Sequence, residues 1–375
     1  MARKHIATIR SLALAALGIL VFSVQTAAAE PKPCLGFCDS GKSKPVGLFV
    51  GGFNFVYEFQ GKALEKSGTP TPNLAFGGTT LFNPLSITFD SHENMWIAYG
   101  GTSSGPLPVI ELTRANLAAL KKGKAVNPKV VIKDKGKSDV PFIVPRSLSF
   151  DSAGDLWVSD PGRNAIMDFL PKQIKKSGAP TPTTFISAAD FIPAAIRFDA
   201  SDNLWVEQFQ ASNPQQISRF APGDRAASGT PNPGLIVDLP DGLDPVDLAF
   251  DSSGNLWLAG PGSTGDALEM ISASDLTGTG EISPSAAVTI TSSAFGVLVG
   301  SGSCLGGIDF DPSGNLWVSV GTNDTNCEAD TQIVEFTPSQ LGTGGNLVPS
   351  VTIGQNHKQI NLVLPGPIRF GATVK

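Results

Sequence analysis

The sequence predicts an all-β protein, a single six-bladed β-propeller built from four-stranded antiparallel blades. Three observations support this prediction. A hairpin motif occurs five times, a third-strand motif occurs six times, and the missing parts of a sixth blade lie at opposite ends of the chain. Self-similarity at roughly 50–60 residues is typical of propellers and solenoids. Four strands in each repeat match the composition of a propeller blade.

The hairpin motif contains every tryptophan of the chain. Its copies span residues 87–96, 148–157, 196–205, 248–257 and 308–317. Each copy begins with alternating apolar residues, such as Leu148 and Phe150, which predict a half-buried strand. The next residue is an aspartate, which we expect to open a turn by bonding its own backbone rather than to bind calcium. We expect the tryptophan of the second strand to fill the space between neighbouring sheets. The aspartates are Asp90, Asp151, Asp199, Asp251 and Asp311.

The third-strand motif follows each hairpin and occurs once more near the N-terminus. It spans residues 56–59, 109–112, 166–169, 217–220, 268–271 and 333–336. An aliphatic residue comes five positions after most copies, but Arg225 breaks this pattern in one connection. A proline closes each connection, and a fourth strand such as residues 351–353 then leads to the next repeat.

The two ends of the chain supply the sixth blade. Residues 367–370 resemble a first strand, and residues 46–50 resemble a second strand. Pairing them places the N- and C-terminal strands in one blade and closes the ring. Such closure removes the exposed edges of an open sheet. The predicted propeller spans residues 43–375.

The first 29 residues have the pattern of a signal peptide. Residues 3–10 carry basic side chains, residues 11–24 are mostly apolar, and three alanines at 27–29 offer a cleavage site. The apolar run is too short for a membrane span. We therefore expect an exported protein, periplasmic or extracellular, without stable membrane insertion after cleavage. An uncleaved membrane anchor is the alternative.

Residues 30–42 form an N-terminal segment that contains two of the four cysteines. Export permits disulfides, and we expect the pairs Cys34–Cys38 and Cys304–Cys327. The second pair has a geometric reason, because Cys304 precedes one strand of a hairpin and Cys327 follows the next. A metal site at Cys34 and Cys38 is the rival interpretation, but no histidine or further cysteine lies nearby in sequence.

Charge and composition limit the partners. The net charge is −6 and no basic stripe is present, which argues against nucleic acid as a partner. Residues 121–137 are locally rich in lysine and coincide with the longest connection. We interpret this region as a solvated loop, and a docking surface for an acidic partner is the alternative. We expect a monomer that binds a protein or a small molecule.

The Phe-Asp-x-x-Gly-Asn-Leu-Trp-type hairpins resemble those of NHL-type and gluconolactonase-like six-bladed β-propellers over nearly all of the mature chain. That superfamily includes metal-dependent lactonases, streptogramin lyases, dehydrogenase-type sugar enzymes and binding modules. The resemblance implies a functional site on the channel axis. In gluconolactonase-like enzymes, a Glu, Asn and Asp set holds a cation there.

Candidate site residues are charged side chains that break the repeat at the end of the channel where first strands begin and second strands end. Asp160, Glu207 and Asp247, from three successive blades, stand where the other blades have mostly small residues. Their oxygens are suited to a hard cation such as Ca²⁺. No asparagine ligand aligns with them. The alternative is that these carboxylates solvate the rim.

Three further charged residues, Arg197, Asp309 and Arg369, fall within first strands, where we expect them to line the channel. Asp309 and Arg369 belong to neighbouring blades, and a simple ion pair between them is one alternative.

Histidine chemistry finds little support. His92 falls in a hairpin turn and His357 in a late connection, neither of them at the predicted channel end. A streptogramin-lyase activity or a Ser-His-Asp relay would therefore lack its base. Two hypotheses remain. The first is a non-catalytic exported propeller that binds a ligand or protein, and the second is a metal-dependent hydrolase or lactonase using Asp160, Glu207 and Asp247.

Overall fold

A computed structural model describes most of the chain after residue 45. The described residues are 46–52, 54–77, 83–100, 108–133, 142–188, 191–209, 215–239, 243–296, 303–321, 331–354 and 366–375. All of them belong to one compact unit, Leu35–Lys375. The predicted signal peptide, Cys34, Cys38 and Cys327 lie outside these residues.

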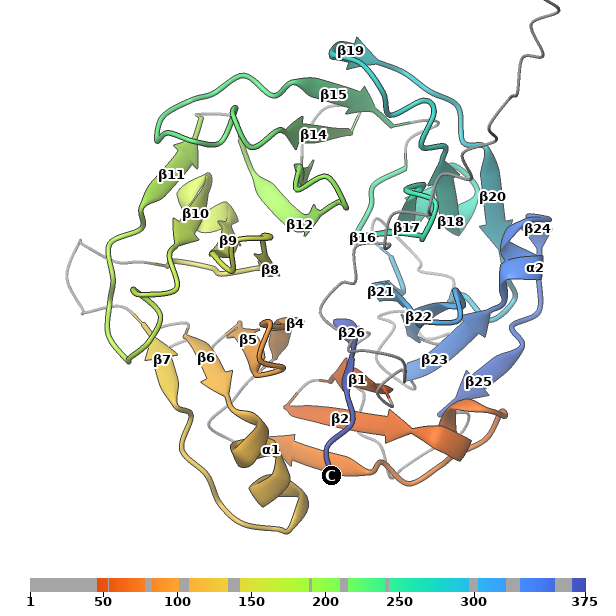
Figure 1. Ribbon diagram of the computed structural model, residues 1–375. Coiled ribbons are helices and arrows are strands. Elements are labelled where there is room, and N and C mark those ends of the chain that lie inside the picture. The colour runs from red at the N-terminus through yellow and green to blue at the C-terminus, as the bar shows by residue number, and fades with distance from the viewer. Residues whose placement is uncertain are drawn as a thin grey trace, which may run out of the picture. The chain divides into compact units, whose positions relative to one another are not determined.

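The unit is a β-propeller of six blades with four antiparallel strands each, which confirms the predicted fold (Figure 1). In blades 4 and 5 a short strand from the connection of the next blade, β19 (Gly280–Ile282) or β24 (Gly345–Asn346), adds in parallel to the outer strand. Blade 1 contains β26 (Ile368–Ala372), β1 (Val46–Gly51), β2 (Phe55–Gln60) and β3 (Leu74–Gly77). Blade 2 contains β4 (Pro84–Phe89), β5 (Met95–Tyr99), β6 (Val109–Leu112) and β7 (Val130–Ile132). Blade 3 contains β8 (Ser147–Phe150), β9 (Leu156–Asp160), β10 (Ala165–Phe169) and β11 (Thr184–Ser187).

The remaining blades follow in chain order. Blade 4 contains β12 (Pro193–Phe198), β13 (Leu204–Gln208), β14 (Gln216–Phe220) and β15 (Leu235–Asp238). Blade 5 contains β16 (Asp247–Phe250), β17 (Leu256–Gly262), β18 (Gly265–Ile271) and β20 (Val288–Thr291). Blade 6 contains β21 (Leu305–Phe310), β22 (Leu316–Gly321), β23 (Thr331–Phe336) and β25 (Val351–Ile353).

The first strand of each blade lies nearest the centre of the ring (Figure 1). These innermost strands contact their neighbours all the way round, from β4 to β8, β12, β16, β21, β26 and back to β4. The ring closes in blade 1, where the C-terminal strand β26 pairs with the N-terminal strand β1. The predicted sharing of one blade by both ends of the chain is confirmed.

The repeated aspartate is a structural residue of the hairpin turn, as predicted. In blade 5 one oxygen of Asp251 accepts from the amides of Ser253 and Asn255, at 2.8 and 3.0 Å. The other oxygen accepts from the side-chain amide of Asn255 at 2.8 Å and from the indole N–H of Trp257 at 3.1 Å. The aspartate therefore fixes both the turn and the tryptophan. The same pattern recurs at Asp90, Asp199 and Asp311.

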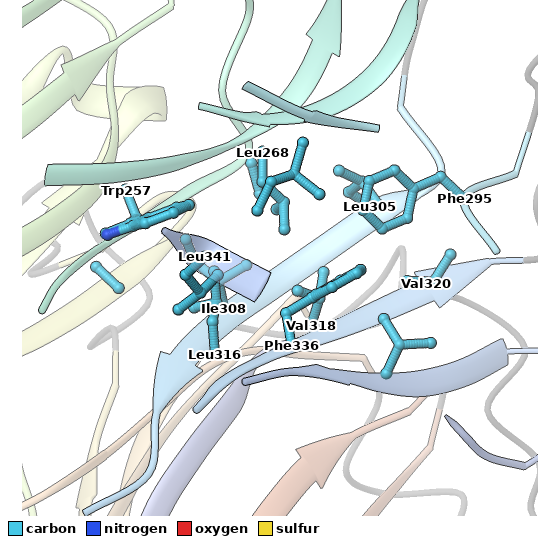
Figure 2. Packing of buried hydrophobic residues seen from close by; sticks show 14 residues of the cluster. Trp257, Leu268, Phe295, Leu305, Ile308, Leu316, Val318, Val320, Phe336 and Leu341 are labelled. Atoms are coloured by element: carbon cyan, nitrogen blue, oxygen red, sulfur yellow. The ribbon is translucent and has the colours of Figure 1, made fainter. Parts of the chain in front are cut away.

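Each tryptophan packs against the next blade. The ring of Trp257 meets Phe310 edge to face, with ring centroids 6.2 Å apart, and the other four tryptophans make the equivalent contact. The cluster between blades 5 and 6 also contains Leu341, the aliphatic residue of the blade 6 connection (Figure 2). The core is thus a series of such clusters between neighbouring blades.

Two short α-helices, α1 (Arg114–Lys121) and α2 (Pro338–Leu341), were not predicted. Thr113 caps α1, since its hydroxyl accepts from the amide of Asn116 at 3.1 Å and its own amide donates to the Asn116 side chain at 3.0 Å. The pattern of Thr followed three residues later by Asn is the sequence signal for this helix start. The lysine-rich region that we interpreted as a loop, residues 121–137, therefore begins at the last residue of α1, and this helix packs against β3.

Connections between third and fourth strands join neighbouring blades at the outer rim. In blade 4, Gly229 pairs in parallel with Ile186 of the blade 3 outer strand. Its N–H donates to the carbonyl of Phe185 at 2.9 Å, and its carbonyl accepts from the amide of Ser187 at 3.0 Å. Gly229 has φ of +137°, a value that favours glycine. This parallel contact is absent from one outer strand among the described residues, β3.

The cysteine pairings stay predictions. Cys304 is buried just before β21, and Cys327, its expected partner, lies outside the described residues. No helix within the described part of the chain is long and apolar enough to span a membrane.

Candidate functional site

The three predicted carboxylates occupy different environments. Asp160 ends β9, Glu207 lies in β13, and Asp247 begins β16. All three side chains are buried. Burial penalises the charged form of a carboxyl group, and it raises the pKa of each of them. What separates the three is how many of their oxygens the protein itself already uses.

Asp160 has a structural role. One of its oxygens accepts from the amide of Ile143 at 2.6 Å, and the other accepts from the amides of Val144 and Arg163 at 3.0 and 3.2 Å. These bonds tie the segment before β8 to the 3₁₀ turn η2 (Pro161–Arg163) after β9. They also lower the pKa of Asp160, although the effect of burial is larger. Both oxygens are therefore committed to the fold.

Asp247 is the centre of an ion-pair network between blades. Both of its oxygens accept from Nη2 of Arg197, at 2.8 and 2.9 Å, and Nη1 of Arg369 lies 3.5 Å from Oδ2. Oδ2 also accepts from the amide of Ile308 in the next blade at 3.1 Å. Arg197 and Arg369 lie on innermost strands. Asp247 therefore links its own blade to three others around the centre of the ring.

Equivalent positions in blades 2 and 3 make the same kind of hydrogen bond as the one that Asp247 accepts from the Ile308 amide. The hydroxyl of Ser86 accepts from the amide of Leu148 at 3.0 Å, and that of Ser147 accepts from Ile196 at 3.2 Å. Each of these bonds links a first strand to the next blade. Asp247 makes the same link and adds the two arginines.

The alternative of a simple ion pair between Asp309 and Arg369 is not what the structure shows. Asp309 accepts from the amide of Phe370 at 2.8 Å, whereas the Arg369 guanidinium donates to the carbonyls of Ile308 and Ile368 and pairs with Asp247. Burial raises the pKa of Asp309 to about 7, while the Phe370 amide and Arg197 lower it. Asp309 therefore serves as another link between neighbouring blades.

Glu207 differs from the other two carboxylates because half of its carboxylate is unused. Oε2 accepts from the amide of Ala195 at 3.0 Å, and no described residue donates to Oε1. Burial raises the pKa of Glu207 to about 7. The Ala195 amide and Arg146 lower it, and Asp244 and Asp247 raise it. A carboxyl group with this pKa is partly protonated near neutral pH, so it can both accept and donate a hydrogen bond.

Sequence reasoning missed Arg146 and Asp244, two charged residues that act electrostatically on Glu207. Arg146 is exposed and Asp244 is half-buried, and Arg146 in turn lowers the pKa of Asp244, which burial raises. Both residues precede first strands, in blades 3 and 5. The equivalent positions before the other first strands are uncharged, so the same search for charged breaks in the repeat, extended by a few residues, finds them.

The predicted set of metal ligands is not assembled. Among the described residues, no group of three or more His, Cys, Asp or Glu side chains could hold a metal ion. Asp160, Glu207 and Asp247 are all described, and Asp160 and Asp247 use both oxygens for amides or arginines. The expected three-carboxylate Ca²⁺ site is therefore corrected to one carboxylate, Glu207, with a free oxygen.

The histidines lie elsewhere. His92 is exposed in the turn between β4 and β5, where its amide donates to Asp90 at 2.9 Å. His357 lies outside the described residues.

We expect the Glu207→Gln variant to be more stable than the wild type at pH 8, by about 2–3 kcal/mol. The pKa of Glu207 is raised from 4.5 to about 7 in the folded state, so the folded protein binds this proton more tightly than the unfolded chain. The contribution of the protonated group to stability is fully present below pH 4.5 and is lost as the pH rises to about 7. Urea unfolding between pH 4 and pH 8 measures it.

The exposed Glu281 in β19 (Gly280–Ile282) provides the control. The Glu281→Gln variant should follow the wild-type pH profile. If the difference in stability between Glu207→Gln and the wild type were the same at pH 4 and at pH 8, the raised pKa would be contradicted.

Comparison with known proteins adds support for the architecture only. No protein-family model matches the chain, and no curated protein matches it either. A protein of unknown function from Bacteroides caccae has a similar structure, with a TM-score of 0.56 and 12% identity over 88% of this chain and 100% of that one. A catalytically inactive variant of virginiamycin B lyase from Staphylococcus aureus, solved with quinupristin, has a TM-score of 0.43 and 16% identity. That match covers 75% of this chain and 72% of the lyase. At 12% identity, the likeness to the Bacteroides caccae protein shows a shared fold and carries no statement about activity.

Proposed function

We propose that this chain is an exported, non-catalytic β-propeller of the NHL-like type that binds a small polar ligand beside Glu207. The observation that carries this proposal is the free oxygen of Glu207. Its carboxyl group is buried and has a single hydrogen-bond donor, the Ala195 amide, among the described residues. A group held in this way is prepared to receive a hydrogen bond from a ligand.

The cost of Glu207 to stability supports a functional role. The other five blades place glycine, alanine or serine at its position (Gly51, Ala98, Ser159, Ala259 and Ser319). A buried carboxylate with one donor destabilises the fold above pH 7, and small residues would avoid this loss. Residues that reduce stability without a structural return are typical of functional sites.

The charges around Glu207 indicate the class of ligand. Asp244 and Glu207 offer acceptors, and the exposed Arg146 offers donors. A mixture of acceptors and donors suits a ligand that carries several hydroxyl groups or an amine, since each polar group of such a ligand finds a partner. A purely anionic ligand fits less well, because Glu207 and Asp244 would face it with negative charge, whereas the charge of Asp247 is already balanced by two arginines.

A thermal-unfolding screen against small polyols, sugars and amines tests the proposal. A ligand at 100 times its Kd stabilises the protein by about 2.7 kcal/mol, which is readily measured as a rise in Tm. The rise should vanish in the Glu207→Ala variant and persist in Glu281→Gln. A ligand that stabilises all three proteins equally binds elsewhere and counts against this site.

The alternative function is a metal-dependent hydrolase or lactonase, although Asp160, Glu207 and Asp247 do not form a metal site among the described residues. Elemental analysis of the mature protein, with and without chelator, separates the two proposals. Stoichiometric Ca²⁺ whose removal lowers Tm would favour the hydrolase, because a structural or catalytic ion stabilises the folded state that binds it. A metal-free protein that ignores the chelator would favour the binding module. Export is tested by N-terminal sequencing of the secreted protein, which should begin near Glu30.

A further inference from the structure

Among the described residues, the outer strand of blade 1, β3, has an open edge that the other outer strands lack. In each of the other five blades, the outer strand pairs in parallel with the connection of the next blade. The first residue of that connection to pair is a glycine. The pairs are Gly68 with Ile353, Gly178 with Ile132, Gly229 with Ile186, Gly280 with Leu235 and Gly345 with Ile290. No described segment pairs with β3 in this way.

The exposed backbone groups follow from the equivalent residues of other blades. In blade 3 the amide of Phe185 donates to the hydroxyl of Ser228 at 3.0 Å, and its carbonyl accepts from Gly229 at 2.9 Å. Ala75 occupies the same position in β3, and Gly77 is equivalent to Ser187. Ala75 and Gly77 are exposed, and neither has a hydrogen bond on this side from a described residue.

A change in sequence explains the missing contact. The pairing glycines stand four residues before the proline of their connection, and in blade 2 that position is Lys124, before Pro128. All five pairing glycines have a positive φ, whereas Lys124 does not. The connection of blade 2 instead forms helix α1, which packs against β3 without pairing with its edge.

The charges beside this edge select its occupant. Lys122 and Lys124 follow α1 directly and are exposed. A second copy of the chain paired through β3 would bring these lysines close to those of its partner, and like charges would oppose the contact. An extended acidic segment gains from the same lysines. Addition of an extended peptide to a free sheet edge is a common mode of recognition.

We infer that β3 is a docking site for an extended acidic peptide of another protein, which adds to blade 1 as a fifth strand parallel to β3. One amide of the peptide donates to the carbonyl of Ala75, and one carbonyl accepts from the amide of Gly77. The peptide residue before the one that donates to Ala75 carries a hydroxyl or carboxylate, which accepts from the amide of Ala75 as Ser228 accepts from that of Phe185. The site is separate from Glu207, so it stands whatever the ligand there.

Amide hydrogen exchange tests the open edge first. In the free protein the amide of Ala75 should exchange at least tenfold faster than those of Val131, Phe185 and Thr352, which donate to serine hydroxyls at 3.0 Å. Equal protection of Ala75 would show that the edge is already covered and would overturn the inference. Protection that rises with protein concentration alone would identify a second copy as the occupant, which also overturns it.

A labelled peptide, Glu-Glu-Ser-Gly-Thr-Val-Glu-Glu, is the binding probe, followed by fluorescence anisotropy and by exchange at Ala75. We expect binding that protects Ala75 and is weakened at least tenfold by N-methylation of the peptide glycine or by lysine in place of glutamate. The K122E/K124E variant should also bind at least tenfold more weakly. The matched variant K175E/K176E, which reverses two exposed charges on the blade 3 connection, should bind as the wild type does. Unchanged affinity in K122E/K124E, or no binding, would overturn the inference.

Discussion

The Arg225→Leu variant is expected to lose about 3–5 kcal/mol of stability at pH 8, the usual cost of removing one partner from a buried ion pair. Arg225 is buried between blades 3 and 4 and donates to Asp151 at 3.2 Å and to Asp202 at 2.6 Å. Its guanidinium also lies over the rings of Trp157 and Phe198, 5.0 and 4.9 Å from their centroids. Removal leaves these acidic groups without their cation.

The loss should depend on pH. The pKa of Asp168 is raised to about 7, mainly by burial and also by the negative charges of Asp155 and Asp151, whereas Arg225 acts to lower it. Burial also raises the pKa of Asp155, which Arg225 again lowers. Without Arg225 the ionised carboxylates repel one another, so the variant is weakest at high pH. As the pH falls below about 7, Asp168 becomes protonated, and the difference from the wild type should become smaller.

A second substitution should rescue the first. In the other hairpins an asparagine donates its side-chain amide to the turn aspartate, but blade 3 has Asp155 there, which cannot donate. Arg225 supplies that donor to Asp151 instead, from the place where the other connections put an aliphatic residue. Leu341 beside Trp257 shows that arrangement (Figure 2). The double variant R225L/D155N restores the common pattern.

Urea unfolding of the wild type, both single variants and the double variant measures the coupling. We expect R225L/D155N to recover at least half of the loss seen in R225L, a coupling of about 1–3 kcal/mol, as found for residues in one network. Additive effects of the two substitutions would contradict the compensation.

Deletion of residues 366–375 should abolish folding. Strand β26 is the innermost strand of blade 1, and Ile368, Phe370 and Val374 are buried. Burial of each such side chain contributes about 1.5–3 kcal/mol. The sum is comparable with the total stability of a typical domain, about 5–15 kcal/mol. The deletion would also expose the edge of β1 and open the ring.

The residues after β26 strengthen the closure. Arg114 donates to the carbonyls of Ala372 and Thr373 at 2.6 and 2.5 Å, and Lys121 donates to Val374 at 2.5 Å. The amide of Val374 donates to the buried Glu58 at 2.8 Å. Circular dichroism and size-exclusion chromatography measure the outcome. Removal of the exposed Lys375 alone should leave the protein folded, and a folded, monomeric 366–375 deletion would contradict the closure.

The sequence predicted the repeated part of the structure well because each repeat carries its own local instructions. Asp251 and Trp257 lie six residues apart and are joined by one hydrogen bond within the hairpin, so their spacing is visible in the sequence. Two helices were missed because they are short insertions within connections whose strand pattern dominates. The cap formed by Thr113 and Asn116 was the available signal for the first of them.

The candidate site was predicted in part. The search for charged breaks in the repeat identified Glu207 and Asp247, and both are buried near the centre of the ring. It could not tell that Asp160 bonds to amides of its own blade, because those amides belong to an irregular segment with no pattern of its own. It named Asp309 as one alternative partner of Arg369 and did not find Asp247, since a strand position fixes the blade but leaves the direction of a long side chain open.

By itself, the sequence determined the six blades, the closure by both ends and the structural role of the repeated aspartates. These features depend on contacts within a repeat or on the count of repeats. Only the tertiary structure decided which of the three candidate carboxylates keeps an oxygen without a described donor, what replaces the missing asparagine beside Asp151, and which described outer strand has an open edge. Each of these depends on residues from neighbouring blades, and such contacts form only when the ring is closed.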